Sequence, residues 1–507
     1  MIGGKESPRW SSGNGWMTGG KESPRWGSVP ANILPKKLYK APVSRSDPEH
    51  VRNIMADLVK FDISSLPKSQ QASYSAQPSI PATPLIVPHR VGGWLPSDHR
   101  VLQRWQARKL HQLKKKRDHT NSAGPMISVP VIVEFKELIE GDPIIYMYFH
   151  EMFDQVPTKP PYDKDPTGTK PQIRDYITML ETFEIIIGEA PSFQDNDLVG
   201  FPINAVLDWP MGTPAGQAAF GDPKVNAQFK KMFTVWFDFL TSLASCSVLN
   251  KNADGWFGPA ASVAMPNFVE TYKCNPLLPA YGFKSWDEFF TREFRDGVRP
   301  LPPDDPRVII SACESAVYAK KYNVNALDII WAKEEPYALA FMLNYDDLAP
   351  QFYDGTVYQA FLSALKYHRW HTPIDGTVTK IVYPRNGTYY LESPTTGFAN
   401  DKGPDPAAPN NSQAFISSMA ARAIIFIQAD NPAIGLYALI FIGMAEVSST
   451  EVTVQPNQPV RKGDPLGMFH FGGSTHCLVF RPEVKVEFLV NENDPVLLSQ
   501  PIATVSN

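Results

Sequence analysis

The sequence of 507 residues is short of cysteine, of long apolar runs and of any excess of one charge. Its four cysteines lie far apart and form no CxxC pair, which excludes a disulfide framework and a zinc ribbon. No apolar run reaches the roughly 20 residues of a membrane span. With 48 basic and 52 acidic residues the net charge is −4, so we expect no nucleic-acid partner. The start of the chain lacks an apolar signal-peptide core, and we expect a cytoplasmic protein.

Proline, in contrast, is abundant, with 48 residues or about 9.5% of the chain against a usual ~5%. The N-terminal part also contains an internal duplicate, GGKESPRW, at Gly3–Trp10 and again at Gly19–Trp26. A stretch rich in Ser, Pro, Gln and Ala follows at Pro67–Pro88, which is typical of linkers. We therefore expect residues 1–125 to form a flexible tail and linker.

A short basic helix is predicted near the end of this tail, where Leu102, Trp105, Leu110 and Leu113 fall near one face. Basic residues, including the run Lys114–Arg117, cover the other face. The favoured interpretation is a helix docked on its own protein with a solvated basic face. Contact with an anionic membrane is the alternative.

Residues 126–265 show helical periodicity. Apolar residues recur at helical spacing from Ile173 to Ile187, and Gly188 and Pro191 then predict the end of that helix. Asp222–Pro223 predicts the start of another, with a capping residue followed by proline at the first helical position. No titratable cluster is evident in this region, so we expect a helical domain with a structural or recognition role.

Residues 266–507 predict a mainly antiparallel β domain, sandwich-like or barrel-like, and the whole chain an α+β protein with its helical region first. The signal is a series of short β-rich runs separated by Pro and Gly: Thr377–Tyr383, Arg422–Ala429, Leu436–Gly443, Val447–Val454 and Val484–Val490.

Two of the ten histidines lie three residues apart in YHRWHTP, at His368 and His371. In a helix both rings would share one face, whereas in a strand or a turn before Pro373 they would diverge. No third ligand lies near them, so we expect no metal. Acid–base chemistry is the favoured interpretation because imidazole titrates near neutral pH, and structural histidines are the alternative.

A Gly-Gly-Ser-Thr tetrad lies between two apolar segments in FHFGGSTHCLVF, residues Phe469–Phe480. A turn would justify the two glycines, which lose much conformational entropy on ordering. The chemical alternative is attack by the Ser474 hydroxyl on the carbonyl of Gly473, followed by elimination that leaves a pyruvoyl ketone on the new N-terminus. Such a serine needs a base, and a histidine oriented by a carboxylate would serve.

Five segments occur in a fixed order from Tyr281 to the C-terminus: YGFKSWDEFFTREFRDGVRP, SACES, HRWHTPIDGTV, FIGMAEVSSTEV and GDPLGMFHFGGST. Together they resemble the pyruvoyl-dependent phosphatidylserine decarboxylase family. The chain is most similar to a soluble fungal branch that includes L-tryptophan decarboxylases and carries an extra helical region before the catalytic part, here about residues 126–265.

The resemblance implies a role for each matching residue. Ser474 is the self-cleavage serine and pyruvoyl precursor, and the cut after Gly473 would leave chains of 473 and 34 residues (507 minus 473). His371 matches the histidine of the charge-relay triad, and His368 matches a histidine linked to decarboxylation. Glu314, in SACES, stands where the lipid enzymes have an aspartate and is the candidate triad acid.

The implied reaction follows from these roles. The covalent pyruvoyl group forms a Schiff base with the substrate amine and takes up the electron pair released with CO2, so no dissociable cofactor is expected. We expect a small-molecule substrate, an aromatic L-amino acid and most specifically L-tryptophan, decarboxylated to tryptamine in secondary metabolism. A phosphatidylserine decarboxylase that forms phosphatidylethanolamine is the alternative, and a non-catalytic scaffold is a third hypothesis.

Overall fold

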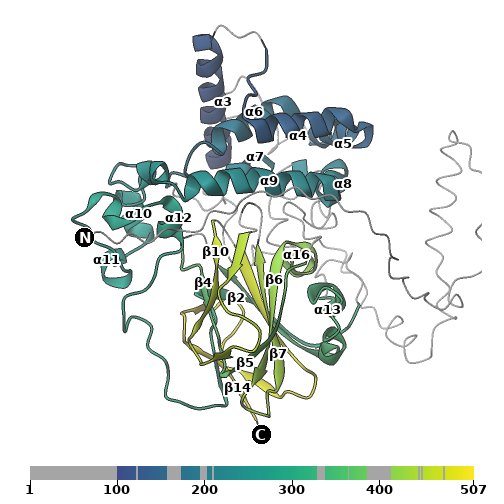
Figure 1. The fold of residues 1–507 in the computed structure, drawn as a ribbon, viewed down its shortest axis with the longest axis vertical. Coiled ribbons are helices and arrows are strands. Elements are labelled where there is room, and N and C mark those ends of the chain that lie inside the picture. The colour runs from purple at the N-terminus through teal and green to yellow at the C-terminus, as the bar shows by residue number, and fades with distance from the viewer. Residues whose placement is uncertain are drawn as a thin grey trace, which may run out of the picture. The chain divides into compact units, whose positions relative to one another are not determined.

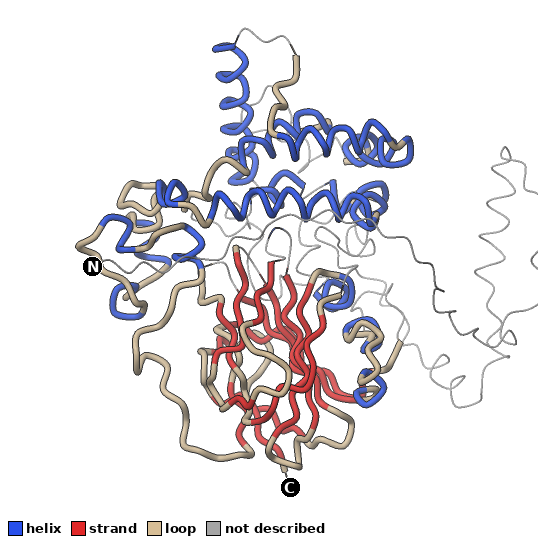
Figure 2. Tube along the Cα trace, viewed as in Figure 1, coloured by secondary structure: helices blue, strands red, loops and turns tan. Residues whose placement is uncertain are grey.

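Helices occupy the first part of the chain and strands the second, as the computed structural model shows (Figure 1). The structure describes residues 100–120, 124–156, 173–193, 202–207, 210–327, 337–362, 365–384, 413–443, 446, 449–471 and 474–506. Most of the predicted N-terminal tail, with its duplicate, lies outside these residues. The predicted α+β class, with helices ahead of mainly antiparallel sheets, is confirmed (Figure 2).

The main helices of the helical region are α3 (Arg100–Thr120), α4 (Pro130–Gly141), α5 (Pro143–Asp154), α6 (Tyr176–Ile186), α7 (Pro202–Leu207), α8 (Pro214–Gly221), α9 (Pro223–Leu240) and α10 (Pro259–Ala264). Most of these helices begin with proline, and three of those described, α5, α6 and α9, are capped by aspartate. The predicted start at Asp222–Pro223 is confirmed, because the Asp222 side chain accepts hydrogen bonds from Lys224 N at 2.7 Å and Val225 N at 3.3 Å. These bonds satisfy amides that a helix leaves without partners.

Aromatic residues fill the core between these helices. Phe135 of α4 packs edge-on against Phe149 of α5 and Phe229 of α9, with ring centroids 5.7 Å and 5.2 Å apart. Each such pair contributes about 0.5–1.5 kcal/mol beyond the burial of its area. The predicted helical periodicity therefore reflects a packed aromatic core.

Helix α3 docks on α6 and the turn after it. Trp105 and Leu113 are buried on its apolar face. On the basic side Lys109 pairs with Glu189 at 2.7 Å, Lys116 pairs with Glu184 at 3.1 Å, and Arg117 pairs with Glu181. Several of its cations are thus neutralised within the chain. No helix in the described ranges has the length and apolarity needed to cross a membrane.

Within the described residues, the β region forms an eight-stranded antiparallel sheet and two three-stranded ones. The large sheet has the order β13 (Pro495–Val496), β2 (Ser315–Val324), β3 (Gly355–Leu362), β11 (Ser474–Phe480), β7 (Leu436–Gly443), β6 (Arg422–Ala429), β5 (Gly376–Val382) and β9 (Pro459–Val460). One small sheet has the order β4 (Arg369–His371), β10 (Pro465–His470) and β8 (Ser449–Val452). The other has the order β1 (Val308–Ile310), β14 (Pro501–Val505) and β12 (Val486–Phe488). The predicted bounds of β6 and β7 are confirmed.

Strands β6 and β7 of the large sheet are buried on both faces, which explains why they are almost continuously apolar. Ile424 and Phe426 belong to one core cluster, together with residues of α13 (Leu339–Met342) and α16 (Gln413–Met419). Ile425 and Ile427 belong to the other, which includes residues of the small sheets. A strand in the middle of the large sheet is therefore shielded from solvent on both sides.

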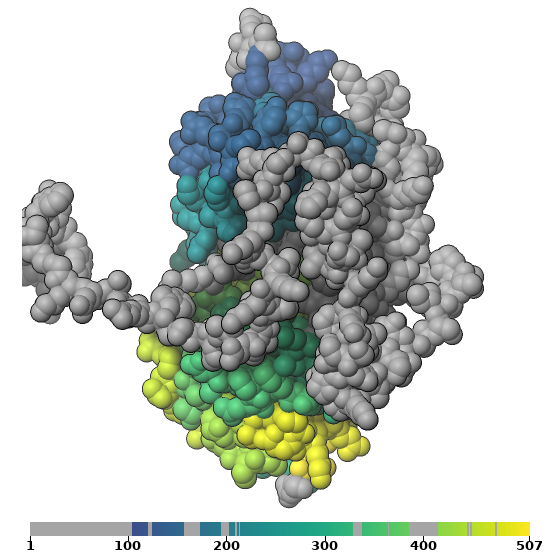
Figure 3. All heavy atoms as spheres, turned by 90° about the vertical axis from the view of Figure 1, so that its right-hand side faces the viewer, coloured from purple at the N-terminus to yellow at the C-terminus, as the bar shows by residue number. Residues whose placement is uncertain are grey.

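The helical region lies at one end of the described strands. Figure 3 shows its residues, in blue and teal, apart from the green and yellow residues of the sheets. Hydrogen bonds join the two regions directly. Glu446, in the chain between β7 and β8, accepts from Ile203 N at 3.1 Å and from Asn204 N at 3.2 Å at the start of α7. The carboxylate of one region thus caps a helix of the other.

Candidate active site around Ser474

Ser474 is the first residue of β11, where it pairs with Leu362 of β3 on one side and Gly443 of β7 on the other. Its side chain is fully buried, and among the described residues its hydroxyl has no hydrogen-bond partner. An unpaired buried hydroxyl costs about 1–3 kcal/mol, which marks the group as one that calls for an explanation. Gly472 and Gly473 lie outside the described residues, so the predicted cleavage bond is described only from its Ser474 side.

Strand alternation places Ser474 on the same face of the sheet as Leu478 and Phe480. These two residues share a core cluster with Trp370 of β4 and Phe469 of β10. The face of Ser474 is therefore the one covered by the small sheet β4–β10–β8. The fold thus brings the YHRWHTP segment to the same face of the sheet as the predicted self-cleavage serine.

His368 lies immediately before β4 and is fully buried. Its ring stacks on Phe290 of α12 (Trp286–Phe290), with centroids 3.9 Å apart and planes 25° apart. Its carbonyl accepts a hydrogen bond from Phe469 N at 2.9 Å. Strands β4 and β10 are antiparallel, so the N-terminal end of β4, next to His368, lies beside the C-terminal end of β10. The chain continues from that end of β10 toward Ser474.

His371, at the other end of β4, has both ring nitrogens bonded. Its Nδ1 lies 2.7 Å from the carbonyl of Gly463 and therefore carries the proton that is donated. Its Nε2 lies 2.9 Å from the hydroxyl of Tyr367, from which it accepts. Burial lowers the pKa of His371, so the ring is held in its neutral form.

The two residues on either side of Trp370 face away from the large sheet. Trp370 stacks on Phe441 of β7, with centroids 3.9 Å apart, so β-strand alternation turns Arg369 and His371 to the opposite side. The divergence of His368 and His371 expected for a strand is what the structure shows. A hydrogen bond between His371 and Ser474 is not among those of the described residues, and their pairing stays a prediction.

Glu314 lies directly before β2 and is almost fully buried. Its Oε1 accepts a hydrogen bond from Arg299 Nε at 2.6 Å. The backbones of the two predicted triad segments are adjacent, because His371 N donates to Ala312 O at 2.9 Å. Within the described ranges no hydrogen bond joins the Glu314 and His371 side chains, so the role of Glu314 as triad acid also stays a prediction.

His470, four residues before Ser474, belongs to a cluster that the sequence did not reveal. Its Nδ1 lies 3.0 Å and 3.1 Å from the two carboxylate oxygens of Asp287, and its Nε2 lies 2.8 Å from Glu451 Oε2. Burial opposes a charge on this ring, but the two carboxylates outweigh it and raise the pKa of His470. Asp287 is 183 positions away in the sequence, and no spacing rule connects the two.

Phe471, the next residue, has a left-handed backbone with φ of 50°. This conformation costs a bulky L-residue roughly 1–2 kcal/mol. The Phe471 ring packs edge-on against Trp236 of α9 and Trp286 of α12, with centroids 4.6 Å and 4.8 Å apart. Two such aromatic contacts contribute about 1–3 kcal/mol together, enough to offset the strain.

His476 and Cys477 follow Ser474 on β11 and are both fully buried. Burial lowers the pKa of His476 to about 4, so this ring stays neutral near pH 7. Burial also raises the pKa of the Cys477 thiol well above its usual range, which keeps the sulfur protonated. Cys477 is therefore a packing residue, and His476 cannot supply a proton near neutral pH.

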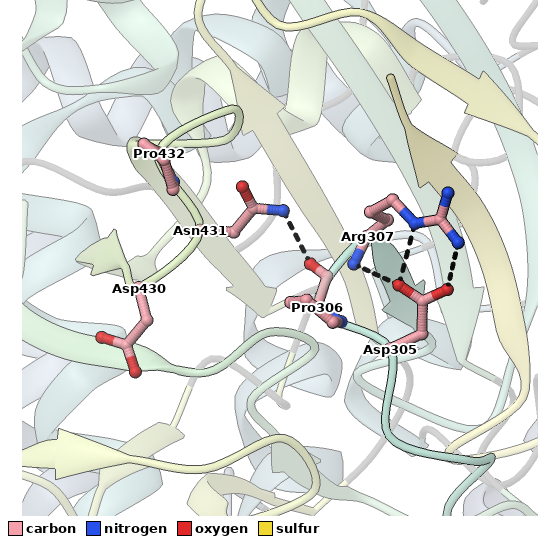
Figure 4. A pocket seen from close by; sticks show the side chains of 6 residues that line it. All are labelled: Asp305, Pro306, Arg307, Asp430, Asn431 and Pro432. Carbon is pink, nitrogen blue, oxygen red and sulfur yellow. Dashed lines mark hydrogen bonds and ion pairs between the residues drawn. The ribbon is translucent and has the colours of Figure 1, made fainter. Parts of the chain in front are cut away.

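A hollow of about 420 Å³ lies elsewhere, between the loop Asp305–Arg307 and the turn Asp430–Pro432. Figure 4 shows the Asp305–Arg307 ion pair at one side of it and Asn431 bonded to Pro306. The turn joins β6 to β7 near Leu436, whereas Ser474 pairs with Gly443, seven residues and roughly 23 Å along the strand. This hollow is thus remote from Ser474. Within the described residues no group of three or more His, Cys, Asp or Glu is placed to hold a metal ion.

Comparison with known proteins identifies two matching segments. Residues 129–265 and 286–504 each match a family model described as phosphatidylserine decarboxylase. The chain is 36% identical over 420 residues to an L-tryptophan decarboxylase of Psilocybe cubensis, which covers 80% of this chain and 91% of that protein. A second L-tryptophan decarboxylase, of Psilocybe cyanescens, is 36% identical over 416 residues, or 78% of this chain and 90% of that protein.

Two further relatives match shorter parts of the chain. Decarboxylase iboD of Amanita muscaria is 41% identical over 302 residues, which is 57% of this chain and 86% of that protein. Phosphatidylserine decarboxylase proenzyme 3 of Schizosaccharomyces pombe is 29% identical over 211 residues, which is 41% of this chain and 20% of that protein. The likeness to the fungal amino-acid enzymes therefore includes the helical region as well as the β region.

Proposed function

Because the chain belongs to the phosphatidylserine decarboxylase family, and is by that membership a carboxy-lyase, we propose that it converts L-tryptophan into tryptamine and CO2. The family uses a pyruvoyl group, and its proenzymes cleave themselves into two chains. The observation that carries the proposal is the buried hydroxyl of Ser474 at the start of a central strand, which has no hydrogen-bond partner among the residues that the structure describes. The substrate assignment is supported by the two L-tryptophan decarboxylases that match about four fifths of the chain.

The proposed first step is self-cleavage at Ser474. Its Oγ attacks the carbonyl carbon of Gly473, the C–N bond between the two residues breaks, and an ester joins them. Elimination across Cα–Cβ of residue 474 then breaks the ester and leaves Gly473 with the carboxylate that ends the large chain. The remaining residue takes up water, loses its nitrogen as ammonia, and becomes the pyruvoyl group. The buried hydroxyl of Ser474 fits this role, because it is shielded from solvent and no described residue forms a hydrogen bond with it.

His371 is the proposed base for this step, and Glu314 is the proposed acid of its triad. The neutral ring of His371 can accept a proton only at Nε2, because Nδ1 already donates to Gly463. Nε2 now accepts from Tyr367, so the tyrosine hydroxyl must move aside or pass the proton on.

Decarboxylation needs an acceptor for electrons and a donor for one proton. The pyruvoyl ketone supplies the electron acceptor for the pair released with CO2. His368 is the proposed donor that returns a proton to the substrate Cα, because imidazole titrates near neutral pH and its ring plane is fixed against Phe290. The buried setting strengthens such polar interactions by excluding water.

A lipid substrate is the second candidate, supported by the description of the family models and by the Schizosaccharomyces pombe relative. It would require attachment to a membrane surface, for which α3 is the basic segment available. Lys109, Lys116 and Arg117 of α3 are, however, already paired with glutamates of the same chain. These ion pairs leave fewer charges for anionic lipid and favour the amino-acid substrate.

The test uses the purified full chain with L-tryptophan, L-tyrosine, L-phenylalanine or phosphatidylserine vesicles, and identifies each product by mass spectrometry. Tryptamine formation supports the proposal, and phosphatidylethanolamine formation in its place replaces the first candidate with the second. Ser474→Ala should remain uncut and inactive with every substrate. Ser417→Ala is the matched control, since Ser417 is also a buried serine but bonds to Ala414 O at 2.7 Å. Product formation by an uncut Ser474→Ala chain would refute the pyruvoyl mechanism.

A further inference from the structure

Two consecutive residues, His470 and Phe471, join the end of β10 to the glycines that precede Ser474; we call them the pre-cleavage segment. Both are buried. Only Gly472 and Gly473 separate this segment from Ser474, and glycine is the residue with the greatest backbone freedom. A link of two glycines adopts one geometry only if the residues on both sides of it are held. Pairing with β3 and β7 holds Ser474, and side chains from two helices hold the pre-cleavage segment on the other side of the glycines.

One pair of side chains comes from α9 in the helical region. Trp236 contacts Phe471, with ring centroids 4.6 Å apart, and the adjacent Phe237 contacts His470, with centroids 5.1 Å apart. Both contacts are edge-to-face, at 72° and 79°. Figure 1 shows α9 crossing the ends of the strands next to β10. Trp236 is itself anchored, because its Nε1 donates to Glu189 O at 2.9 Å.

A second pair comes from α12. Trp286 contacts Phe471, with centroids 4.8 Å apart, and the adjacent Asp287 accepts from Nδ1 of His470 at 3.0 Å. This pair is anchored too, because Trp286 N donates to the buried hydroxyl of Ser245 at 2.8 Å. Two dipeptides from different helices thus each hold both residues of the pre-cleavage segment. Glu451 of β8 closes the arrangement at the other nitrogen of His470.

We propose that Trp236–Phe237 and Trp286–Asp287 position the bond that self-cleaves, so that the helical region takes part in processing as well as in folding. The proposal rests on the proposed self-cleavage at Ser474. Among the hydrogen bonds and ring contacts of the described residues, none joins these four residues to Ser474, so we assign them as positioning residues. By holding Phe471 in its left-handed conformation they fix the chain on the N-terminal side of the bond that is cleaved, and a displacement of about 1 Å at a reacting centre costs on the order of 100-fold in rate.

The first test follows processing of the full chain after cell-free synthesis, by the loss of the intact band and the appearance of the C-terminal fragment on a denaturing gel. Trp236→Leu should slow processing by about 10-fold or more, and Trp236→Phe, which keeps an aromatic ring, should restore most of the rate. A tenfold change corresponds to about 1.4 kcal/mol in the barrier. Phe135→Leu is the matched control: it removes a buried ring of the same region that packs against Phe149 and Phe229 instead.

A second variant covers the case in which Trp236→Leu fails to fold. Asp287→Asn keeps the shape of the side chain but removes the charge that faces His470, and should slow processing several-fold. Its control is Glu288→Gln, a neighbouring carboxylate on α12 that bonds to Lys284 N at 2.5 Å. Thermal unfolding of each chain measures its stability separately from its processing rate.

The outcomes are distinct. Slower processing in Trp236→Leu and Asp287→Asn, with rescue by Trp236→Phe and near-normal rates in both controls, supports the inference. Equal slowing in Phe135→Leu and Trp236→Leu at equal loss of stability overturns it, as does a wild-type rate in both Trp236→Leu and Asp287→Asn. A wild-type chain that never cleaves overturns the proposed function and this inference together. The two overturning results given for the variants, obtained with a wild-type chain that does cleave, overturn this inference alone.

Discussion

Glu314→Gln distinguishes a catalytic carboxylate from one that only stabilises the fold. In the structure Glu314 is 4% exposed and accepts from Arg299 Nε at 2.6 Å. Glutamine keeps the length and one acceptor oxygen but removes the charge. A hydrogen bond to a charged group contributes about 1.5–3 kcal/mol and a neutral one about 0.5–1.5 kcal/mol, so we expect a loss of about 1–2 kcal/mol. The melting temperature of the β region should therefore fall by a few degrees.

Processing gives the second measurement. If the Glu314 charge orients and supports His371, its removal should slow self-cleavage on the order of 10²–10⁴-fold, the range of a lost acid–base contribution. Arg299→Lys is the matched control. It keeps the positive charge beside Glu314, but it loses the Nε hydrogen bond and the contact of the guanidinium with Phe294, 4.7 Å from the ring centroid. We expect a comparable loss of stability with a processing rate within a few-fold of wild type.

The assays are the gel time course of processing and thermal unfolding of the same samples. A Glu314→Gln chain that loses stability yet cleaves at the wild-type rate would refute the assignment and make Glu314 a structural partner of Arg299. Slow processing in both variants would show that the ion pair as a whole, and not the carboxylate alone, supports the site.

Two other predictions concern stability. Burial lowers the pKa of His476 to about 4, from ~6.5 in the unfolded chain. The stability that comes from keeping this ring neutral is therefore complete above about pH 6.5 and is lost as the pH falls toward 4. The loss in the free energy of unfolding is about 3 kcal/mol. His476→Asn takes up no proton, so its melting temperature should fall less than that of the wild type between pH 6.5 and pH 4, as measured by calorimetry. An equal fall in both proteins would contradict this prediction. Asp222→Ala removes the cap of α9 and should reduce the free energy of unfolding by about 1 kcal/mol, measured as a lower melting temperature. Asp222→Asn can still cap the helix and should retain most of this stability. An equal loss in both variants would argue against capping.

Local patterns in the sequence determined much of the architecture. Asp222–Pro223 placed the start of α9, because a cap and a proline act within one helical turn. The largely apolar runs Arg422–Ala429 and Leu436–Gly443 have the same bounds as β6 and β7, because a strand buried on both faces is apolar at nearly every position. The order of motifs from Tyr281 onward also pointed to the family that the comparisons then showed.

What the sequence could not determine is which side chains meet at the site. His368 and His371 were grouped by their spacing, but strand β4 separates them: His368 lies against Phe290, and His371 turns away to Tyr367 and Gly463. Glu314 was identified by its motif, yet its partner Arg299 depends on how the chain before β2 folds back. The motif therefore located these residues without defining their contacts.

The strongest example is the pre-cleavage segment. The residues that hold His470 and Phe471 come from α9, α12 and β8, and Trp236 is more than 230 positions away in the sequence. Local propensity and periodicity determine which face of an element is apolar, because they act between near neighbours along the chain. Which faces pack together is decided only when distant elements assemble, since that choice depends on the fit of whole surfaces and not on any short stretch of residues.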